Sequence, residues 1–258
     1  MSDLSGKFGL IVGVANKRSI SWAIAQAAAA AGARLALTYP SERLEENVRE
    51  LAATLDNPLV LPCDVASDDQ IATIGTTLDR EFGGLDFFVH GAAFAPADAL
   101  KNPFTDTSRE SFRVALDVST YSLIGLSRAL VPLMEKRGGG SILTLTFIGS
   151  GRVFTNYNVM GVAKAALESS VRYLASDLGP RNIRVNAISA GAIKTLASAG
   201  ISGISTMLQA YREKSPLRRG VETAEVADAA VFLLSAAGRG ITGEILMVDS
   251  GFHAMGGA

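Results

Sequence analysis

The sequence predicts an α/β fold: a single Rossmann-like, doubly wound domain in which a parallel sheet of about seven strands is flanked by helices on both faces. Short apolar segments alternate with longer amphipathic segments almost from end to end. No Pro/Ser-rich linker, internal repeat or low-complexity block interrupts the alternation. A length of 258 residues also suits one large α/β domain. The strands are expected to be parallel because the helical segments between them provide the crossovers that parallel strands need.

Four strands and three helices are predicted before residue 90. The first strand, 8–12, is a short apolar run bounded by Gly13, and the Ala- and Ile-rich helix at 20–31 is closed by Gly32 at the C′ position. A helix at 67–82 has two aspartates in its first turn, where carboxylates complement the helix dipole. The remaining elements continue the alternation: strand 34–38, helix 42–55, strand 59–63 and strand 85–89.

After residue 90 the same pattern continues with longer connections. The predicted elements are helices 107–118 and 121–137, strand 141–146, helix 159–178, strand 183–188, helix 223–235 and strand 244–248. In a doubly wound sheet, ligands bind beyond the carboxyl ends of the strands. The segments that directly follow the strands are therefore the candidates for a binding site: 13–21, 38–41, 64–65, 90–96, 146–157 and 190–203.

Composition narrows the classes of function. The 24 Lys and Arg against 25 Asp and Glu give a net charge of −1, which argues against binding to nucleic acid. One Cys and two His offer neither an internal disulfide nor a metal site. The start lacks a signal-peptide pattern, and the most apolar run, 22–33, is too short to span a bilayer. We therefore expect a cytoplasmic protein with no membrane segment and no metal.

The turn between the first strand and the first helix is the first candidate site. It contains Gly13, and Ser19 and Ile20 stand where the helix begins, so backbone N–H groups could meet a pyrophosphate there. The complete G-x-G-x-x-G fingerprint is absent, and a strand-turn-helix unit without any ligand remains an open alternative.

The segments after the second and third strands bear on recognition of an adenosine. Residues 38–41 contain neither the acid that binds a ribose in NAD enzymes nor the base typical of NADP enzymes. After the third strand, Asp64 and Val65 could bind an adenine, with the Asp64 carboxylate accepting from its amino group. The alternative is that Asp64 caps the helix that starts near Ser67.

A third candidate is the pair Tyr157 and Lys164 at the start of the long helix. Seven positions are close to two turns, so both side chains project from one face about 10 Å apart along the axis. The Lys164 side chain leans back toward Tyr157, leaving room for a ribose between them. A nearby ammonium favours tyrosinate and so makes the phenol a better proton donor. On a helix without other signals, such a pair is usually coincidence.

Several stretches resemble the NADH-dependent enoyl-acyl-carrier-protein reductases of type II fatty-acid synthesis, a divergent branch of the short-chain dehydrogenase/reductase family. The similarity is strongest at 156–165 (Asn-Tyr-Asn-Val-Met-Gly-Val-Ala-Lys-Ala) and 184–191 (Arg-Val-Asn-Ala-Ile-Ser-Ala-Gly). The distance from Tyr157 to Lys164 is the specific part, because most short-chain dehydrogenases have Tyr-x-x-x-Lys and position 161 here is Gly. Further matches run in order along the chain: Gly13-Val-Ala, Ser19-Ile20, Cys63-Asp64-Val65, Phe94-Ala95-Pro96, 119–122 and 248–252.

The resemblance implies that NADH gives hydride to the β-carbon of a trans-2-enoyl thioester carried by acyl carrier protein or CoA. It makes Tyr157 and Lys164 the catalytic residues, with Tyr157 stabilising the enolate oxygen and Lys164 holding the nicotinamide ribose. The implied cofactor contacts are Gly13, Ser19, Ile20, Asp64, Val65, Ala92, Lys164, Ile193, Lys194, Thr195, Leu196 and Ala197. The implied substrate contacts are Ala95, Phe147, Tyr157 and Met160.

The resemblance also implies one reductase domain over 1–258, with a substrate-binding lid at 190–207, and a homotetramer. Pro40 and Ser41 stand where NADPH-preferring members have basic residues, which favours NADH over NADPH. Other positions depart from the commonest pattern. Phe147 replaces a second tyrosine, 91–93 (Gly-Ala-Ala) replaces a Ser-Ile-Gly type of segment, and Ala192 and Lys194 replace a proline and an arginine in the lid.

Two other functions remain open at this point. One is a 3-oxoacyl or other carbonyl reductase on the same scaffold, which the missing Tyr-x-x-x-Lys disfavours. The other is a non-catalytic NAD-binding protein, which the presence of both Tyr157 and Lys164 disfavours. His90 is expected to be packed or bonded to backbone, His253 to face solvent or another subunit, and Cys63 to be a small core residue.

Overall fold

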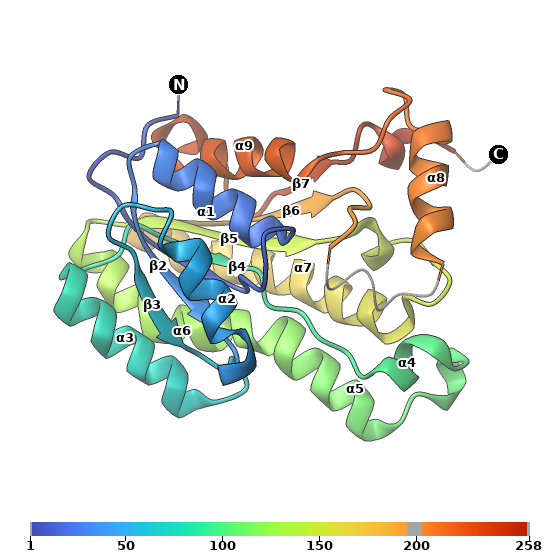
Figure 1. The fold of residues 1–258 in the computed structure, drawn as a ribbon, viewed down its shortest axis with the longest axis horizontal. Coiled ribbons are helices and arrows are strands. Elements are labelled where there is room, and N and C mark those ends of the chain that lie inside the picture. The colour runs from blue at the N-terminus through green and yellow to red at the C-terminus, as the bar shows by residue number, and fades with distance from the viewer. Residues whose placement is uncertain (1, 196–202, 257–258) are drawn as a thin grey trace.

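A seven-stranded sheet forms the centre of the computed structural model, which describes residues 2–195 and 203–256 (Figure 1). The strand order is β3-β2-β1-β4-β5-β6-β7, and every neighbouring pair is parallel. The predicted fold class is therefore confirmed. The strands are β1 (Phe8–Val12), β2 (Arg34–Tyr39), β3 (Leu59–Pro62), β4 (Phe87–His90), β5 (Gly140–Thr146), β6 (Ile183–Ala190) and β7 (Ile245–Val248).

Alternation along the strands builds a separate hydrophobic core on each face of the sheet. On β1, Ile11 points into one core, whereas Leu10 and Val12 point into the other. On β4, Val89 and Phe88 divide in the same way. Because both faces of the central strands are buried, these strands are largely apolar, which is why the sequence shows runs rather than an alternating pattern.

Three helices cover each face. The first core is closed by α1 (Ile20–Ala30), α2 (Glu42–Ala52) and α9 (Thr223–Leu234), and the second by α3 (Asp68–Phe82), α6 (Ser122–Lys136) and α7 (Asn158–Leu178) (Figure 1). The expected stop signal at Gly32 is present: Gly32 lies just past the end of α1 and has a left-handed backbone, with a φ of 96°. Ser67 accepts the Gln70 N–H at 3.3 Å and so caps α3.

Three features of the helical layer differ from the prediction. The helices expected at 107–118 and 121–137 form one continuous run, in which α5 (Arg109–Leu116) is joined to α6 by a π-helical segment, Asp117–Tyr121. Two helices were not predicted, α4 (Ala97–Lys101) and α8 (Ile204–Lys214). The second of these is held by Tyr211, a fully buried ring that stacks on Phe252 at 3.9 Å.

One helical run among the described residues, Arg109–Lys136, is long and apolar enough to cross a membrane by length and composition alone. It consists of α5, the π-helical segment and α6, and 56% of its most apolar window is buried inside the fold. Leu123, Leu126 and Leu130 lie in the second core. Packing against the sheet therefore accounts for the apolar character of this run.

Candidate active site

The strand order reverses between β1 and β4, and the loops that leave these strands lie against each other. Gly13 has a φ of 91°, and a Cβ built on it would lie 2.5 Å from the Gly91 carbonyl oxygen. A Cβ on Gly91 would in turn lie 2.1 Å from the Ser21 Oγ and 2.8 Å from the Val12 oxygen. Glycine is therefore required at both positions. At position 91 the reason is that no space is left for a Cβ atom. The loops meet at the switch point where doubly wound sheets bind ligands.

The N-terminus of α1 opens at the same place. Ser19 is the N-cap residue, but its hydroxyl donates to the Asn16 carbonyl at 2.6 Å and does not cap the helix. The first turn contains no acidic residue, and Ile20 is its first member. The backbone N–H groups of this turn, with the positive end of the helix dipole, are suited to an anion such as a diphosphate.

Asp64 and Val65 follow β3, which is separated from β1 by β2 in the sheet order. The Asp64 carboxylate accepts a hydrogen bond from the Ala66 N–H at 3.0 Å, and the backbone N–H of Asp64 donates to the Gln70 side chain at 2.7 Å. The alternative in which Asp64 caps α3 is wrong, because Ser67 caps that helix. Asp64 remains exposed at the strand end, and Val65 is buried beside it.

Tyr157 is placed by two asparagines with left-handed backbones. It is the N-cap residue of α7, and Asn156 and Asn158 on either side have φ values of 64° and 40°. The Asn158 amide donates to the carbonyls of Leu100 and Asn102, at 3.2 and 2.9 Å, and so joins α4 to the start of α7. This local conformation points to a constrained position for the Tyr157 ring.

Two glycines let the Tyr157 ring and the first turn of α7 approach the loop after β5. A Cβ on Gly149 would lie 2.6 Å from the Tyr157 ring, and a Cβ on Gly161 would lie 2.8 Å from the Gly149 carbonyl oxygen. Position 161, where Tyr-x-x-x-Lys would place its lysine, therefore has no room for a side chain. The lysine of this chain stands instead one turn further, at Lys164.

Lys164 is buried, with 6% of its surface exposed. Its Nζ donates to the Leu145 carbonyl of β5 at 2.7 Å, so the side chain is aimed at the carboxyl end of the sheet. Burial lowers the pKa of Lys164 to about 8, and the negative charge of Glu168 opposes that shift. An ammonium has three donors, and the Leu145 carbonyl takes one of them.

The direction of the pKa shift of Tyr157 differs from the expectation. A nearby ammonium was expected to favour tyrosinate and so to lower the pKa, but burial, and secondarily the negative charge of Glu168, raise the pKa of the Tyr157 phenol. The phenol therefore stays protonated around neutral pH and is a hydrogen-bond donor rather than a base.

The four predicted substrate residues lie in one hydrophobic cluster. Ala95, Tyr157 and Met160 are buried members of it, and Phe147 packs against it. The Phe147 ring lies edge-on to Tyr157 at 5.1 Å. The cluster also contains residues that the sequence did not single out: Ala99, Leu100, Ala115, Leu116, Phe154, Val159 and Ala163.

The π-helical segment helps to position this cluster. This role was not predicted from the sequence. Ser119 accepts the Phe94 N–H at 3.0 Å and donates to the Phe94 carbonyl at 3.1 Å, next to Ala95. Thr120 donates to the Ala163 carbonyl of α7 at 2.8 Å. The segment thus ties the loop after β4, which also includes Ala92, to the helix that carries Lys164.

The remaining predicted contacts follow β6. Ile193 and Thr195 are partly buried and Lys194 is exposed, with the Thr195 N–H donating to the Ile193 carbonyl at 3.0 Å. Leu196 and Ala197 lie outside the described residues. The predicted lid at 190–207 begins at the last residue of β6 and ends inside α8.

The structure also shows the surroundings of the two histidines and the cysteine. His90 is fully buried between the hydroxyls of Thr144 and Ser122, each at 2.8 Å, and burial lowers its pKa to about 3, so the ring is neutral. His253 is partly exposed, as expected, but its ring is also held by Asp249 at 2.9 Å. Cys63 is buried, as expected for a small core residue.

The loop that precedes Tyr157 also holds the end of the chain. Arg152 donates to the carbonyls of His253 and Met255, at 2.7 and 3.3 Å. Within the described ranges, no group of His, Cys, Asp or Glu side chains is arranged to hold a metal ion.

A doubly wound sheet with a buried Tyr157 and Lys164 at its carboxyl edge defines an oxidoreductase of the short-chain dehydrogenase/reductase class. Residues 13–253 match the sequence model of a family described as enoyl-(acyl carrier protein) reductase. The enoyl-[acyl-carrier-protein] reductase [NADH] FabI of Nostoc sp. is 52% identical over 259 residues, which cover 99% of this chain and all of the relative. The chain belongs to the enoyl-(acyl-carrier-protein) reductase family.

Solved structures of the same family have the same fold. The enoyl-acyl carrier protein reductase of Bacillus cereus, solved with NADP+ and indole naphthyridinone, has a TM-score of 0.96 at 50% identity and covers 99% of this chain and 100% of that one. The reductase of Anaplasma phagocytophilum, solved with NAD, has a TM-score of 0.94 at 47% identity and covers 98% of this chain and 96% of that one.

Proposed function

We propose that the protein reduces the C2–C3 double bond of trans-2-enoyl thioesters carried by acyl carrier protein, or by CoA, with hydride from NADH, in type II fatty-acid synthesis. The observation that carries the proposal is the buried pair Tyr157 and Lys164, set beside an apolar cluster at the carboxyl edge of the sheet. A protonated phenol next to an apolar cluster suits an acyl thioester better than it suits a charged substrate.

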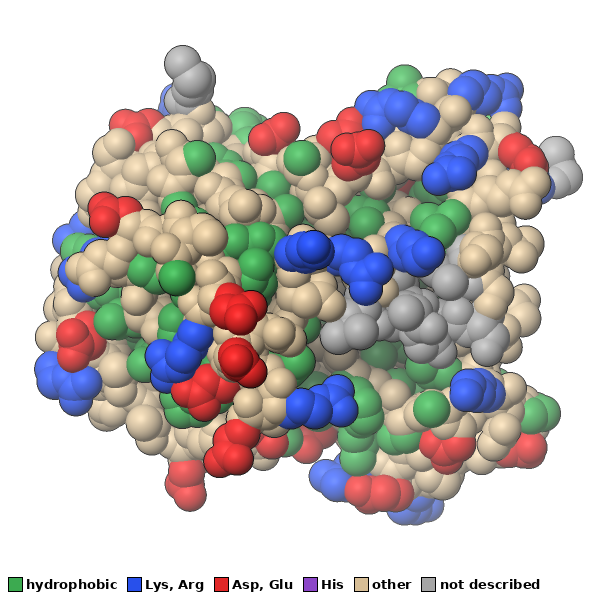
Figure 2. Space-filling view, viewed as in Figure 1, with side chains coloured by type: hydrophobic (Ala, Val, Ile, Leu, Met, Phe, Trp, Pro, Cys, Tyr) green, Lys and Arg blue, Asp and Glu red, His purple; other side chains and the backbone are tan. Residues whose placement is uncertain are grey.

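The residues at the strand ends fit a nicotinamide dinucleotide. The open N-terminus of α1, behind Gly13, Ser19 and Ile20, offers N–H donors to a diphosphate, and the exposed Asp64 carboxylate beside Val65 offers an acceptor to an adenine. Figure 2 shows Lys and Arg side chains gathered near the middle of this face, over the turn between β1 and α1. The further contacts of the proposed cofactor site are Ala92, Lys164, Ile193, Lys194, Thr195, Leu196 and Ala197.

NADH, when bound there, supplies the hydride that adds to C3 of the enoyl group. The electron pair of the C2–C3 double bond then moves to the thioester oxygen, where the Tyr157 hydroxyl donates a hydrogen bond to the developing enolate. Lys164 holds the ribose hydroxyls and contributes positive charge beside the same oxygen. A proton taken from water and added at C2 completes the saturated thioester. The raised pKa of Tyr157 keeps its proton in place for this role.

The acyl chain is expected to lie against the cluster that contains Ala95, Phe147 and Met160, with Tyr157 at its polar end. We propose that residues 190–207 form the lid over the acyl chain. We also propose that the lid belongs to one reductase domain that spans 1–258. The lid begins at the carboxyl end of β6, at the edge of the sheet that carries Lys194 and Thr195. Such a placement suits a segment that closes over a ligand bound at the strand ends.

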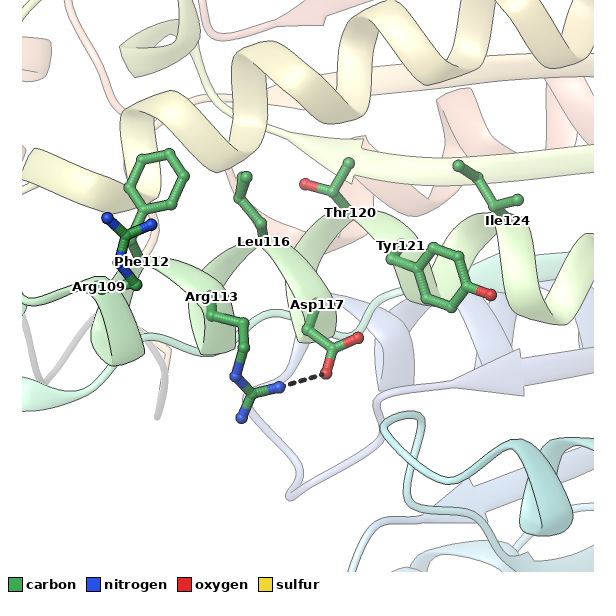
Figure 3. Close-up of a pocket in the computed structure, with 8 residues that line it drawn as sticks. All are labelled: Arg109, Phe112, Arg113, Leu116, Asp117, Thr120, Tyr121 and Ile124. Carbon is green, nitrogen blue, oxygen red and sulfur yellow. Dashed lines mark ion pairs between the residues drawn. The ribbon is translucent and has the colours of Figure 1, made fainter.

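We also propose that the protein is a cytoplasmic homotetramer. A groove on the outer side of α5, the π-helical segment and α6 is lined by Phe112, Leu116, Tyr121 and Ile124, with Arg113 and Asp117 paired beside it (Figure 3). A second groove shares Ile124 and continues over α7 to Tyr173, which is 78% exposed. We refer to the two grooves together as the α5–α7 face. The exposed aromatic and aliphatic side chains on this face support a contact between copies.

The test is cofactor oxidation by the purified protein. NADH and NADPH are each offered with crotonyl and longer trans-2-enoyl thioesters, and with acetoacetyl thioester as the control substrate. Oxidation of NADH that depends on the enoyl thioester is expected. Turnover of the keto thioester alone would leave the class of enzyme in place and overturn the enoyl assignment, and binding without turnover on any thioester would overturn the reaction itself.

A further inference from the structure

A carboxylate that the proposed reaction does not use lies one helical turn from its lysine. Glu168 stands four positions after Lys164 on α7, so the two side chains leave the same face of the helix one turn apart. Both are held by neighbouring residues of β5. Leu145 accepts the Lys164 ammonium at 2.7 Å, and the Thr146 hydroxyl donates to a Glu168 carboxylate oxygen at 2.6 Å. Strand and helix thus hold an ammonium and a carboxylate one helical turn apart, without a direct ion pair between them.

The surroundings of Lys164 make that carboxylate important. Burial disfavours an ammonium, and Thr146 is itself only 5% exposed, so little solvent reaches this corner of the fold. From β4, the neighbouring His90 ring is neutral and provides no negative charge. From the π-helical segment, Asp117 is paired with Arg113 on the outer surface (Figure 3). Tyr157, at the start of α7, keeps its proton. Glu168 is therefore the neighbouring group whose negative charge opposes the effect of burial on Lys164.

We infer that Glu168 is a positioning residue for the proposed reaction: locked by Thr146 one turn beyond Lys164, it keeps that lysine a cation where the nicotinamide ribose is expected to bind. This inference rests on the proposed function, because it assigns to Glu168 a task only if Lys164 binds the cofactor. Glu168 acts through Lys164 and does not itself touch substrate or cofactor. Thr146 contributes by holding the carboxylate in a single orientation.

The consequence is a pH dependence of NADH binding that Glu168 sets. In the intact protein Lys164 is protonated below about pH 8, so NADH affinity should decline as the pH rises through that value. Removing the charge of Glu168 removes an influence that raises the pKa of Lys164, so the decline should begin at lower pH. A nearby opposite charge typically moves a pKa by about one unit or more. At pH 8, affinity should then fall about fivefold, while at pH 6 it should not change.

The experiment measures the dissociation constant of NADH by fluorescence titration between pH 6 and pH 9.5, for the wild type and for Glu168→Gln. Glu135→Gln is the matched control, because Glu135 is an exposed carboxylate on α6 whose partner is Arg181. Thr146→Val and Thr146→Ser form a second pair, in which the serine keeps the hydroxyl that holds Glu168. Enoyl-thioester reduction by the wild type is recorded in parallel.

We expect a lower midpoint for Glu168→Gln and Thr146→Val, and the wild-type midpoint for Thr146→Ser and Glu135→Gln. A Glu168→Gln profile with the wild-type midpoint, or one weakened equally at every pH, would overturn the inference, since simple structural damage has no reason to depend on the protonation of Lys164. If Glu168→Gln does not fold, the Thr146 pair decides in the same way. If the wild type binds no NADH, the proposed function and the inference are both refuted. If the wild type reduces enoyl thioesters but the pH midpoint of NADH binding is the same in Glu168→Gln, the inference alone is refuted.

Discussion

Replacing Tyr157 with phenylalanine removes one hydroxyl and leaves the ring. The ring is 7% exposed and makes its edge contact with Phe147 at 5.1 Å, so the variant should fold, with a stability change of no more than about 1 kcal/mol. Because burial keeps the phenol protonated, the donor is present in every wild-type molecule at neutral pH. Losing one oxyanion donor typically costs a factor of about 10²–10³ in kcat, or roughly 3–4 kcal/mol. The affinity for NADH should stay nearly unchanged, because Lys164 holds the ribose.

The assay is NADH oxidation with crotonyl thioester at saturating substrate, together with NADH titration of the same preparation. Tyr211→Phe is the matched control, because it removes another buried phenol, in α8, whose ring stacks on Phe252. The control should turn over like the wild type. Wild-type kcat in Tyr157→Phe would refute the reasoning, and a loss of NADH affinity as large as the loss of kcat would show that the hydroxyl serves binding rather than the reaction.

Three other outcomes are expected. Lys164→Ala should raise the Kd for NADH about tenfold to a hundredfold, because a charge-assisted hydrogen bond contributes about 1.5–3 kcal/mol; an unaltered Kd in titration would contradict its role. Gly161→Ala should lower the free energy of unfolding by about 1–3 kcal/mol in denaturant titration, because its Cβ would lie 2.8 Å from the Gly149 oxygen. Gly179→Ala, with no atom within 4 Å, should be neutral, and equal losses in both would argue against crowding. Tyr173→Glu should give a smaller species in light scattering if the α5–α7 face joins copies, and an unchanged mass would place the contact elsewhere.

Most of the sheet could be predicted because both of its faces are buried. The strands are then largely apolar runs, and the crossovers between runs indicate a parallel order. The π-helical segment escaped prediction because 107–118 and 121–137 both have helical periodicity, and one extra residue between them is not visible in a hydrophobic pattern. The helix α8 escaped because its long flanking segment of small residues has no such pattern, and Tyr211 becomes a core residue only through Phe252.

The candidate site was predictable where topology alone decides, and less so where burial decides. Most of the predicted contacts lie in segments that directly follow a strand, and the carboxyl edge of a parallel sheet brings such segments together. The direction of the pKa shift of Tyr157 was missed, because proximity to Lys164 is visible in the sequence while the dryness around the phenol is not. Glu168 was missed for a similar reason, since its bond to Thr146 joins a helix to a strand 22 residues away.

The hydrogen bonds from Arg152 to the C-terminal segment have a practical consequence for handling the protein. The carbonyls of His253 and Met255 are bound by the loop that leads to Tyr157, whereas the N-terminus lies at the far side of the molecule (Figure 1). An affinity tag or surface linkage fused after residue 258 would therefore pull on the loop that leads to the proposed oxyanion donor. Purification and immobilisation are better done through the N-terminus, which leaves that loop under no external load.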